Sequence, residues 1–175
     1  MTNHVINRWE LEGPPEAIDA FEALALTEPV PDRRGRLARV LGRPPAPSVG
    51  ARTLDPERIL PTPPRVARDP GAARDWRLAH WGFQHWDPEP TWYERAGPAR
   101  ATLLFHTPWS AGSGLLAALA ARVPPALTIR ASDVEPGNAC AGRSRVEAGR
   151  FSREEVAFTR TFYEAVAGEP LDDDV

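Results

Sequence analysis

The sequence predicts an α/β domain of the α+β kind, a ferredoxin-like βαββαβ sandwich whose antiparallel sheet carries its helices on one face. Segments with apolar residues at every second position, typical of strands, alternate with segments whose apolar residues recur every three to four positions, typical of helices. The length of 175 residues, with 42% hydrophobic and 26% charged residues, fits one soluble domain over residues 1–175. No run reaches the roughly 20 apolar residues of a membrane span.

The first strand and the first helix follow from these two periods. Residues 4–12 form the predicted strand, with Trp9 on one face and Arg8 on the other. The Gly13-Pro14-Pro15 segment ends this strand, because proline cannot donate to a sheet and suits the first turn of a helix. Residues 16–26 form the predicted helix, with apolar side chains on one stripe and acidic residues near its N-terminus.

Residues 28–70 are predicted to form a Pro/Arg-rich insertion after this helix. The insertion holds ten of the 20 prolines, which disfavour long helices and central strands. A short basic helix at residues 32–41 and an edge strand at residues 54–60 are expected within it. Two interpretations stay open, an ordered surface insertion and a binding loop, since long loops in compact domains often carry function.

A Trp-rich helix is predicted at residues 70–81. Asp69 supplies an N-cap acceptor before a proline at the first helical position, and Gly82 provides the stop. Because Trp76 and Trp81 are five residues apart, they lie about 140° apart around the helix. They cannot belong to one stripe, so we expect one of them to enter the core and the other to cover a neighbouring element.

The remainder of the chain is predicted to supply four strands and two helices. Ala96, Gly97 and Pro98 mark the turn of a hairpin, and Ser152 with Glu155 forms a capping box that predicts a helix start. In chain order the expected elements are strands 91–95 and 100–107, helix 111–123, strands 126–132 and 139–147, an added C-terminal helix 152–167, and an acidic tail 171–175.

The tryptophans are the most informative residues of the chain, because four of the six lie within residues 75–94. Each tryptophan side chain has about 150–250 Å² to bury, so such a cluster packs beneath something or binds something. We expect Trp9, Trp76 and Trp109 to be mainly buried and to tie the Trp-rich helix to the sheet. The residues expected to contact a protein partner are Trp81, Phe83, His85, Trp86, Trp92 and Tyr93.

Several short segments together resemble the YubB ferredoxin-like domain family of bacteriophages and plasmids. They occur in that family's order over residues 2–150 and are Thr2-Asn3-His4-Val5-Ile6-Asn7-Arg8 with Glu12-Gly13-Pro14, Ile59-Leu60-Pro61-Thr62-Pro63, Trp76-Arg77-Leu78-Ala79-His80-Trp81-Gly82, Phe105-His106-Thr107-Pro108-Trp109-Ser110, and Ala141-Gly142-Arg143. The chain departs from the family at Trp81-Gly82-Phe83-Gln84-His85-Trp86, which is one residue longer and lacks the family's lysine. The resemblance implies the ferredoxin-like fold and a mobile-element setting. It implies no active site, because the family carries no settled catalytic activity.

Charge is unevenly distributed along the chain, whose formal net charge is −3. Residues 1–31 carry one arginine against six acids (net −5), residues 32–77 eleven against five (net +6), and residues 78–175 nine against thirteen (net −4). A basic segment between acidic ends is typical of a surface that faces a polyanion. Nucleic-acid binding is therefore the alternative function, with contacts expected from Arg33, Arg34, Arg36, Arg39 and Arg43. Against it, no strand carries the aromatic signature of an RNA-binding sheet.

No set of residues typical of catalysis or metal binding stands out. Cys140 is the only cysteine, and although it could pair with a histidine such as His106, a lone cysteine is more often a core residue. His80 and His85 lack the spacing of metal ligands and are expected to pack beside tryptophans. Lysine is absent, which excludes a phosphate-binding loop with its lysine. We expect no catalytic residue, metal or cofactor, and a small hydrolase-type enzyme is the least favoured alternative.

The sequence thus predicts a non-catalytic accessory protein of a phage or mobile element that acts by binding a host bacterial protein. Tryptophan and arginine are the residues enriched at interface hot spots. Inhibition of a bacterial defence system such as CRISPR is a specific form of this hypothesis and rests on the implied setting. With one cysteine, no signal peptide and no membrane span, we expect a cytoplasmic protein of the bacterial host cell, a monomer or homodimer that does not engage membranes.

Overall fold

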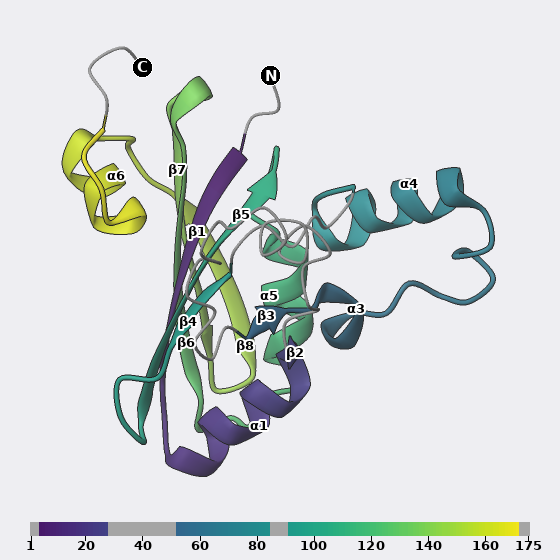
Figure 1. The fold of residues 1–175 in the computed structure, drawn as a ribbon, viewed down its shortest axis with the longest axis horizontal. Helices are drawn as coiled ribbons and strands as arrows, with labels where there is room; N and C mark the ends of the chain where they lie inside the picture. Colours follow the sequence, from purple (N-terminus) through teal and green to yellow (C-terminus); the bar gives the residue numbers. More distant parts are fainter. Residues whose placement is uncertain (1–3, 28–51, 85–90, 172–175) are drawn as a thin grey trace, which may run out of the picture.

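The computed structural model describes residues 4–27, 52–84 and 91–171 of the chain (Figure 1). The predicted helix at residues 32–41 and nearly all of the acidic tail lie outside these described residues. The elements are, in chain order, β1 (His4–Glu12), α1 (Pro15–Ala25), β2 (Leu26–Thr27), β3 (Thr53–Leu54), α3 (Pro56–Ile59), α4 (Pro70–Trp81), β4 (Trp92–Glu94), β5 (Arg100–Pro108), α5 (Ser113–Ala120), β6 (Thr128–Glu135), a short 3-10 helix (Pro136–Asn138), β7 (Cys140–Glu147), β8 (Arg150–Glu155) and α6 (Arg160–Ala167).

Six strands form one antiparallel sheet in the order β4-β5-β1-β6-β7-β8, and β2 pairs with β3 in a separate two-stranded sheet (Figure 1). The predicted mixed α+β architecture with an antiparallel sheet is confirmed. The first strand, β1, lies inside the sheet, where Trp9 is opposite Leu103 of β5 and Ala131 of β6. The two strands that flank β1 therefore come from segments more than 85 residues further along the chain.

One face of the sheet, which we call the helical face, is covered by α1 and α5 (Figure 1). Ile18 and Phe21 of α1 and Leu119 of α5 are fully buried against the apolar residues of the strands. Trp9 is only 1% exposed and meets Phe105 edge-on, with ring centroids 5.0 Å apart. The predicted burial of Trp9 is confirmed, and its large apolar area contributes directly to the stability of the core.

The opposite face of the sheet is covered by α6 over one part only (Figure 1). Ile6, Val134 and Ala141 form an apolar cluster there with Tyr163 and Val166 of α6. The expected placement of helices on one face holds for α1 and α5, whereas α6 packs on the other face. We call the remainder of that second face the open face.

The helix α4 spans Pro70–Trp81, as predicted. The Asp69 carboxylate accepts hydrogen bonds from the backbone N–H groups of Gly71 (2.8 Å) and Ala72 (3.2 Å), which begins the helix. Gly82 ends it in the left-handed region at φ 97°. None of the described helices is long and apolar enough to cross a membrane.

The predicted capping box at residues 152–155 is wrong, because these residues form the strand β8 rather than the start of a helix. Ala148 and Gly149, with φ of 49° and 73°, form a two-residue hairpin turn that pairs β8 with β7. The C-terminal helix α6 begins later, where the Thr159 hydroxyl accepts a hydrogen bond from the Phe162 N–H at 3.1 Å. The local Ser-x-x-Glu pattern was thus overridden by strand pairing.

The predicted edge strand at residues 54–60 is correct only at its start. β3 contains two residues, Thr53 and Leu54, and α3 follows at once. Asp55 accounts for the change, because its carboxylate accepts a hydrogen bond from the Glu57 N–H at 3.0 Å and Pro56 occupies the first helical position.

Candidate protein-binding site

Trp109 lies in a strained turn between β5 and α5. Its φ is 68°, and the N–H of Ser110 donates a hydrogen bond to the carbonyl oxygen of Pro108 at 2.9 Å, which closes a three-residue γ-turn. A bulky residue in this region of φ costs about 1–3 kcal/mol relative to a relaxed backbone. The Trp109 side chain is 62% exposed, so the predicted burial of this residue is wrong.

A buried polar pair holds the base of this turn. Asn7 of β1 and Thr107 of β5 are both buried, and the Asn7 Nδ2 donates to Thr107 Oγ1 at 2.8 Å and to the Val5 carbonyl at 3.0 Å. The Thr107 hydroxyl in turn donates to the carbonyl oxygen of Ser110 at 2.5 Å. A side chain of the first strand thereby fixes the backbone on both sides of Trp109.

The end of α4 supports the same turn from the other side. A Cβ atom added to Gly82 would lie 2.9 Å from Ser110 Oγ, so the turn packs directly onto the stop of α4. A Cβ atom added to Gly114 of α5 would lie 1.8 Å from the carbonyl oxygen of His80. Only glycine permits this approach of the two helices, which leaves little freedom for the turn between them. We call residues 107–110, together with Asn7, Gly82 and Gly114 that support them, the Trp109 turn.

The structure places Trp81 and Phe83 in the core, which corrects the expectation that they contact a partner. Each is 1% exposed, and the Trp81 Nε1 donates a hydrogen bond to the Leu60 carbonyl at 2.8 Å. Trp81 is the tryptophan of α4 that enters the core. Trp76 is half-buried and stacks on His80, with ring centroids 4.2 Å apart, so the expectation of histidine beside tryptophan holds for His80.

Trp92 and Tyr93 lie side by side on the edge strand β4 but face opposite sides of the sheet. Trp92 is 47% exposed on the open face, as required of a contact residue. The Tyr93 hydroxyl donates to Glu22 Oε1 at 2.5 Å, and Arg95 pairs with the same carboxylate at 3.1 Å. Burial, followed by this hydrogen bond, raises the pKa of Tyr93 above its ordinary value. Tyr93 is therefore engaged within the fold, and of this pair only Trp92 is available.

Two further expected contacts, His85 and Trp86, lie outside the described residues.

The strand order separates the two members of the possible nucleophile pair, Cys140 and His106. Cys140 is exposed on β7 and His106 lies on β5, so β1 and β6 lie between them. Among the described residues, no group of three or more His, Cys, Asp or Glu side chains is placed to hold a metal ion.

Neither the models of known protein families nor the curated protein sequences match this chain. Its structure is similar to the crystal structure of protein api92 from Yersinia pseudotuberculosis, which is assigned to the family DUF1281. The TM-score is 0.62 at 11% sequence identity, and the similarity covers 90% of this chain and 99% of that chain. At this identity the likeness concerns the fold alone.

Proposed function

We propose that the protein is a non-catalytic binding protein that docks a partner protein through the Trp109 turn. The observation that carries this proposal is the strained, exposed tryptophan. Exposing an indole to water and holding its backbone at positive φ both cost free energy, and the fold gains little packing in return. Such strain persists where the surrounding structure imposes it, and a partner's pocket is the natural place for the side chain.

The support beneath Trp109 favours recognition of another protein. Exposed tryptophan is a frequent hot-spot residue, and burying one such anchor often carries 2 kcal/mol or more of binding free energy. The Asn7–Thr107 pair and the close packing at Gly82 fix the turn before any partner arrives. Preorganisation of this kind reduces the entropy lost on association. Trp92 offers a second aromatic contact on the edge strand β4.

We further propose that the partner is a host bacterial protein and that this chain is an accessory protein of a phage or mobile element. The segments that resemble the YubB family support this, because three of them meet at the Trp109 turn through Asn7, Gly82 and Thr107. The strand order β4-β5-β1-β6 with α1 and α5 on one face supports a ferredoxin-like core, extended by β7 and β8. Inhibition of a defence system such as CRISPR is the specific form of this proposal.

The described part of the basic segment gives less support to nucleic-acid binding. Arg52 pairs with Glu22, Arg77 pairs with Glu57 at 2.8 Å, and Arg58 donates to a backbone carbonyl of α1. These three of the six described arginines of the segment are used within the fold, whereas Arg65, Arg68 and Arg74 are exposed. The arginines from Arg33 to Arg43, on which that alternative mainly rests, lie outside the described residues.

The test uses the full chain as bait in bacterial lysate, followed by calorimetry with the purified partner. We expect Trp109→Gly to weaken partner binding by about 30-fold or more, since glycine keeps the turn and removes the anchor. Leu78→Ala is the matched control, because Leu78 is another large apolar residue, 44% exposed, on the neighbouring helix α4. Equal binding by the wild type and Trp109→Gly would contradict the proposal. So would tight, salt-sensitive binding of naked nucleic acid, or turnover of a nucleotide or peptide.

A further inference from the structure

The open face of the sheet presents two parallel rows of side chains beside α6, whose Phe162 meets Arg143 of the first row. Cross-strand pairing defines each row, because directly opposed residues project to the same face. From β4 to β8 the first row is Trp92, Leu104, Arg8, Ser132, Arg143 and Glu154, and the second is Glu94, Thr102, Glu10, Arg130, Arg145 and Ser152. Both signs of charge occur along both rows, so the open face as a whole is not a polyanion-binding surface.

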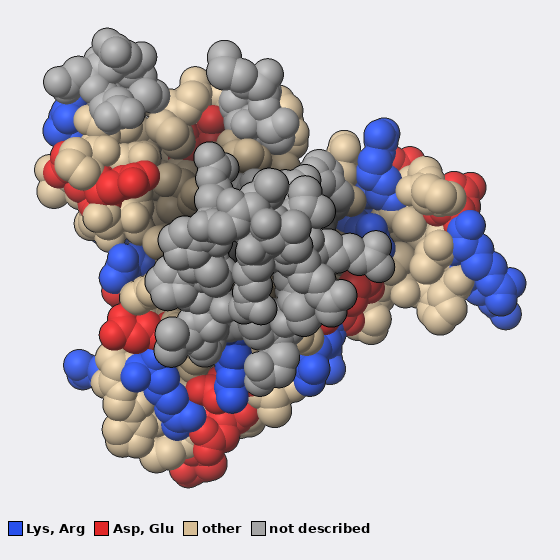
Figure 2. Space-filling model, in the orientation of Figure 1, with Lys and Arg blue, Asp and Glu red and all other residues tan. Residues whose placement is uncertain are grey.

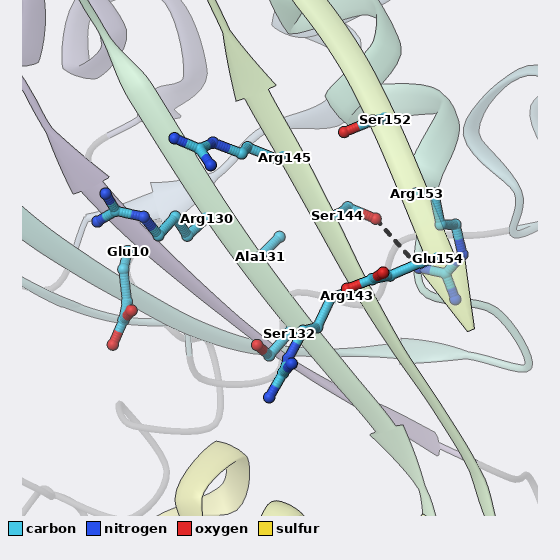
Figure 3. Close-up of a pocket in the computed structure, with 10 residues that line it drawn as sticks. All are labelled: Glu10, Arg130, Ala131, Ser132, Arg143, Ser144, Arg145, Ser152, Arg153 and Glu154. Carbon is cyan, nitrogen blue, oxygen red and sulfur yellow. Dashed lines mark hydrogen bonds between the residues drawn. The ribbon is translucent and has the colours of Figure 1, made fainter. Parts of the chain in front are cut away.

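A hollow of about 600 Å³ lies on this face over β6, β7 and β8 (Figure 3). Its lining includes Arg130, Arg143 and Arg145. Figure 3 shows these side chains, with Glu10, on one side of the strands, whereas the hydrogen-bonded Ser144–Arg153 pair points to the other side. Its volume falls within the range of small-molecule sites. A space-filling view of the molecule shows that arginines and acids are otherwise intermixed over the surface it displays (Figure 2).

The arginines of the hollow differ in how they are paired within the protein. Arg130 pairs with Glu12 at 3.0 Å, and Arg145 pairs with Glu147 at 2.5 Å. Arg143 has no carboxylate within 4.0 Å among the described residues. Its guanidinium instead lies over the ring of Phe162 in α6, 5.1 Å from the ring centroid. Stacking of this kind holds the plane of the guanidinium and leaves its N–H edge available for an anion.

Two hydroxyl groups adjoin Arg143 and Arg145 across the strands. Ser132 is directly opposite Arg143, and Ser152 is directly opposite Arg145. Neither hydroxyl makes a hydrogen bond with any described residue of the chain. The hollow therefore combines Arg143, which has no acidic partner, Arg145, which is paired with Glu147, and two free hydroxyl donors, and these groups together can bind a phosphate. Its lining also holds the carboxylates of Glu10 and Glu154, the second directly opposite Arg143, which can accept hydrogen bonds from other groups of a ligand.

We propose that this hollow binds a small ligand that carries one phosphate group. Arg143 and Arg145 bind the phosphate oxygens, Ser132 and Ser152 donate further hydrogen bonds, and Glu10 and Glu154 accept from hydroxyl or amino groups of the same ligand. A phosphate monoester carries a charge of about −1.5 to −2 near neutral pH, and Arg143 offers it a positive charge without an acidic partner while Arg145 adds N–H donors beside Glu147. This site goes beyond the proposed docking function and shares no residue with the Trp109 turn.

The charges of the open face disfavour a nucleic-acid strand on it. A strand that crossed the sheet would bring further phosphates against Glu94, an acid of this face that lies outside the hollow. Trp92, the exposed aromatic residue of this face, lies four strand spacings from Arg143, roughly 19 Å at about 4.8 Å per strand. The base of a mononucleotide in the hollow could not reach it to stack. The geometry favours a compact ligand with a single phosphate.

The test is a titration of the full-length, ¹⁵N-labelled protein with inorganic phosphate and with adenosine 5′-monophosphate, followed by NMR. Sodium chloride at matched ionic strength is the reference. We expect saturable shifts confined to the amides of Ser132, Arg143, Arg145 and Ser152, with the monophosphate ester binding more tightly than inorganic phosphate. Arg143→Gln should weaken both by about tenfold or more, because it removes a charge-assisted hydrogen bond.

The matched control is Arg100→Gln, an exposed arginine of the same face outside the hollow, which should leave both affinities unchanged. Phe162→Leu should weaken binding less than Arg143→Gln, while the spectrum keeps the dispersion of the folded protein. Shifts no larger than those caused by chloride would overturn the proposal, as would equal losses in Arg143→Gln and Arg100→Gln. Tighter, steeply salt-dependent binding of a single-stranded oligonucleotide would overturn it in favour of a nucleic-acid interface.

Discussion

Trp9 lies within the sheet and Trp109 lies in the turn that follows β5, and the two tryptophans have opposite environments. Trp9 is 1% exposed on the central strand, with a relaxed backbone and an aromatic neighbour. Trp109 is 62% exposed, and its backbone is held at φ 68°. The first region uses its tryptophan to stabilise the fold. The second holds its tryptophan exposed at a cost in free energy, which is the feature on which the proposed docking of a partner protein rests.

The first test of this comparison is truncation of the buried tryptophan. Trp9→Ala should lower the free energy of unfolding by about 3–5 kcal/mol, because it leaves a cavity beside Phe105 in the helical face. Chemical denaturation gives this value directly. A loss below about 1 kcal/mol would mean that the core does not depend on Trp9 and that the contrast with Trp109 is absent.

The second test removes the buried pair beneath the turn. Asn7→Ala should lower the free energy of unfolding by about 1–3 kcal/mol, since it leaves the Thr107 hydroxyl without its buried donor. It should also weaken partner binding, because the turn loses its attachment to β1. Thr102→Ala, at a half-buried threonine of β5 on the open face, serves as the control for stability and should change it far less. Undiminished partner binding by Asn7→Ala would separate the pair from the proposed site.

The third test concerns Tyr93, the neighbour of Trp92 that is engaged within the fold. Its folded-state pKa is raised, so its contribution to stability is present below the unfolded pKa of about 10 and is lost as the pH rises above that value. We expect the wild type to lose stability above about pH 10 and Tyr93→Phe to show a flatter alkaline limb. Thermal unfolding measured across this pH range checks the sign, and a steeper limb in Tyr93→Phe would contradict it.

The sequence-based predictions were correct where the interactions that decide the structure join residues close together in the sequence. Trp9 was predicted correctly because the period of two along β1 decides which face each residue joins. Both ends of α4 were predicted correctly, because Asp69 at the start and Gly82 at the stop each act within one turn of the helix. These signals are local, so they can be seen without knowledge of the tertiary structure.

The errors lie where distant segments decide the outcome. The alternation of β5 ends at Pro108, so it carries no information about Trp109, whose turn depends on Asn7, 100 residues away from Thr107. The capping box at Ser152 lost to the pairing of β8 with β7, and the hairpin turn at Ala148 and Gly149 was the signal that could have shown this. The arginine hollow was also missed, because its side chains meet only once the register of β6 and β7 is known.

The most direct test of the account measures stability and binding together in Trp109→Gly. Relief of the positive-φ strain offsets the flexibility that glycine adds to the unfolded chain. The free energy of unfolding should therefore stay unchanged or rise by up to about 2 kcal/mol, while partner binding falls by about 30-fold or more. A variant that unfolds more than about 1 kcal/mol more easily and still binds the partner normally would show that Trp109 serves the fold, and would contradict the account.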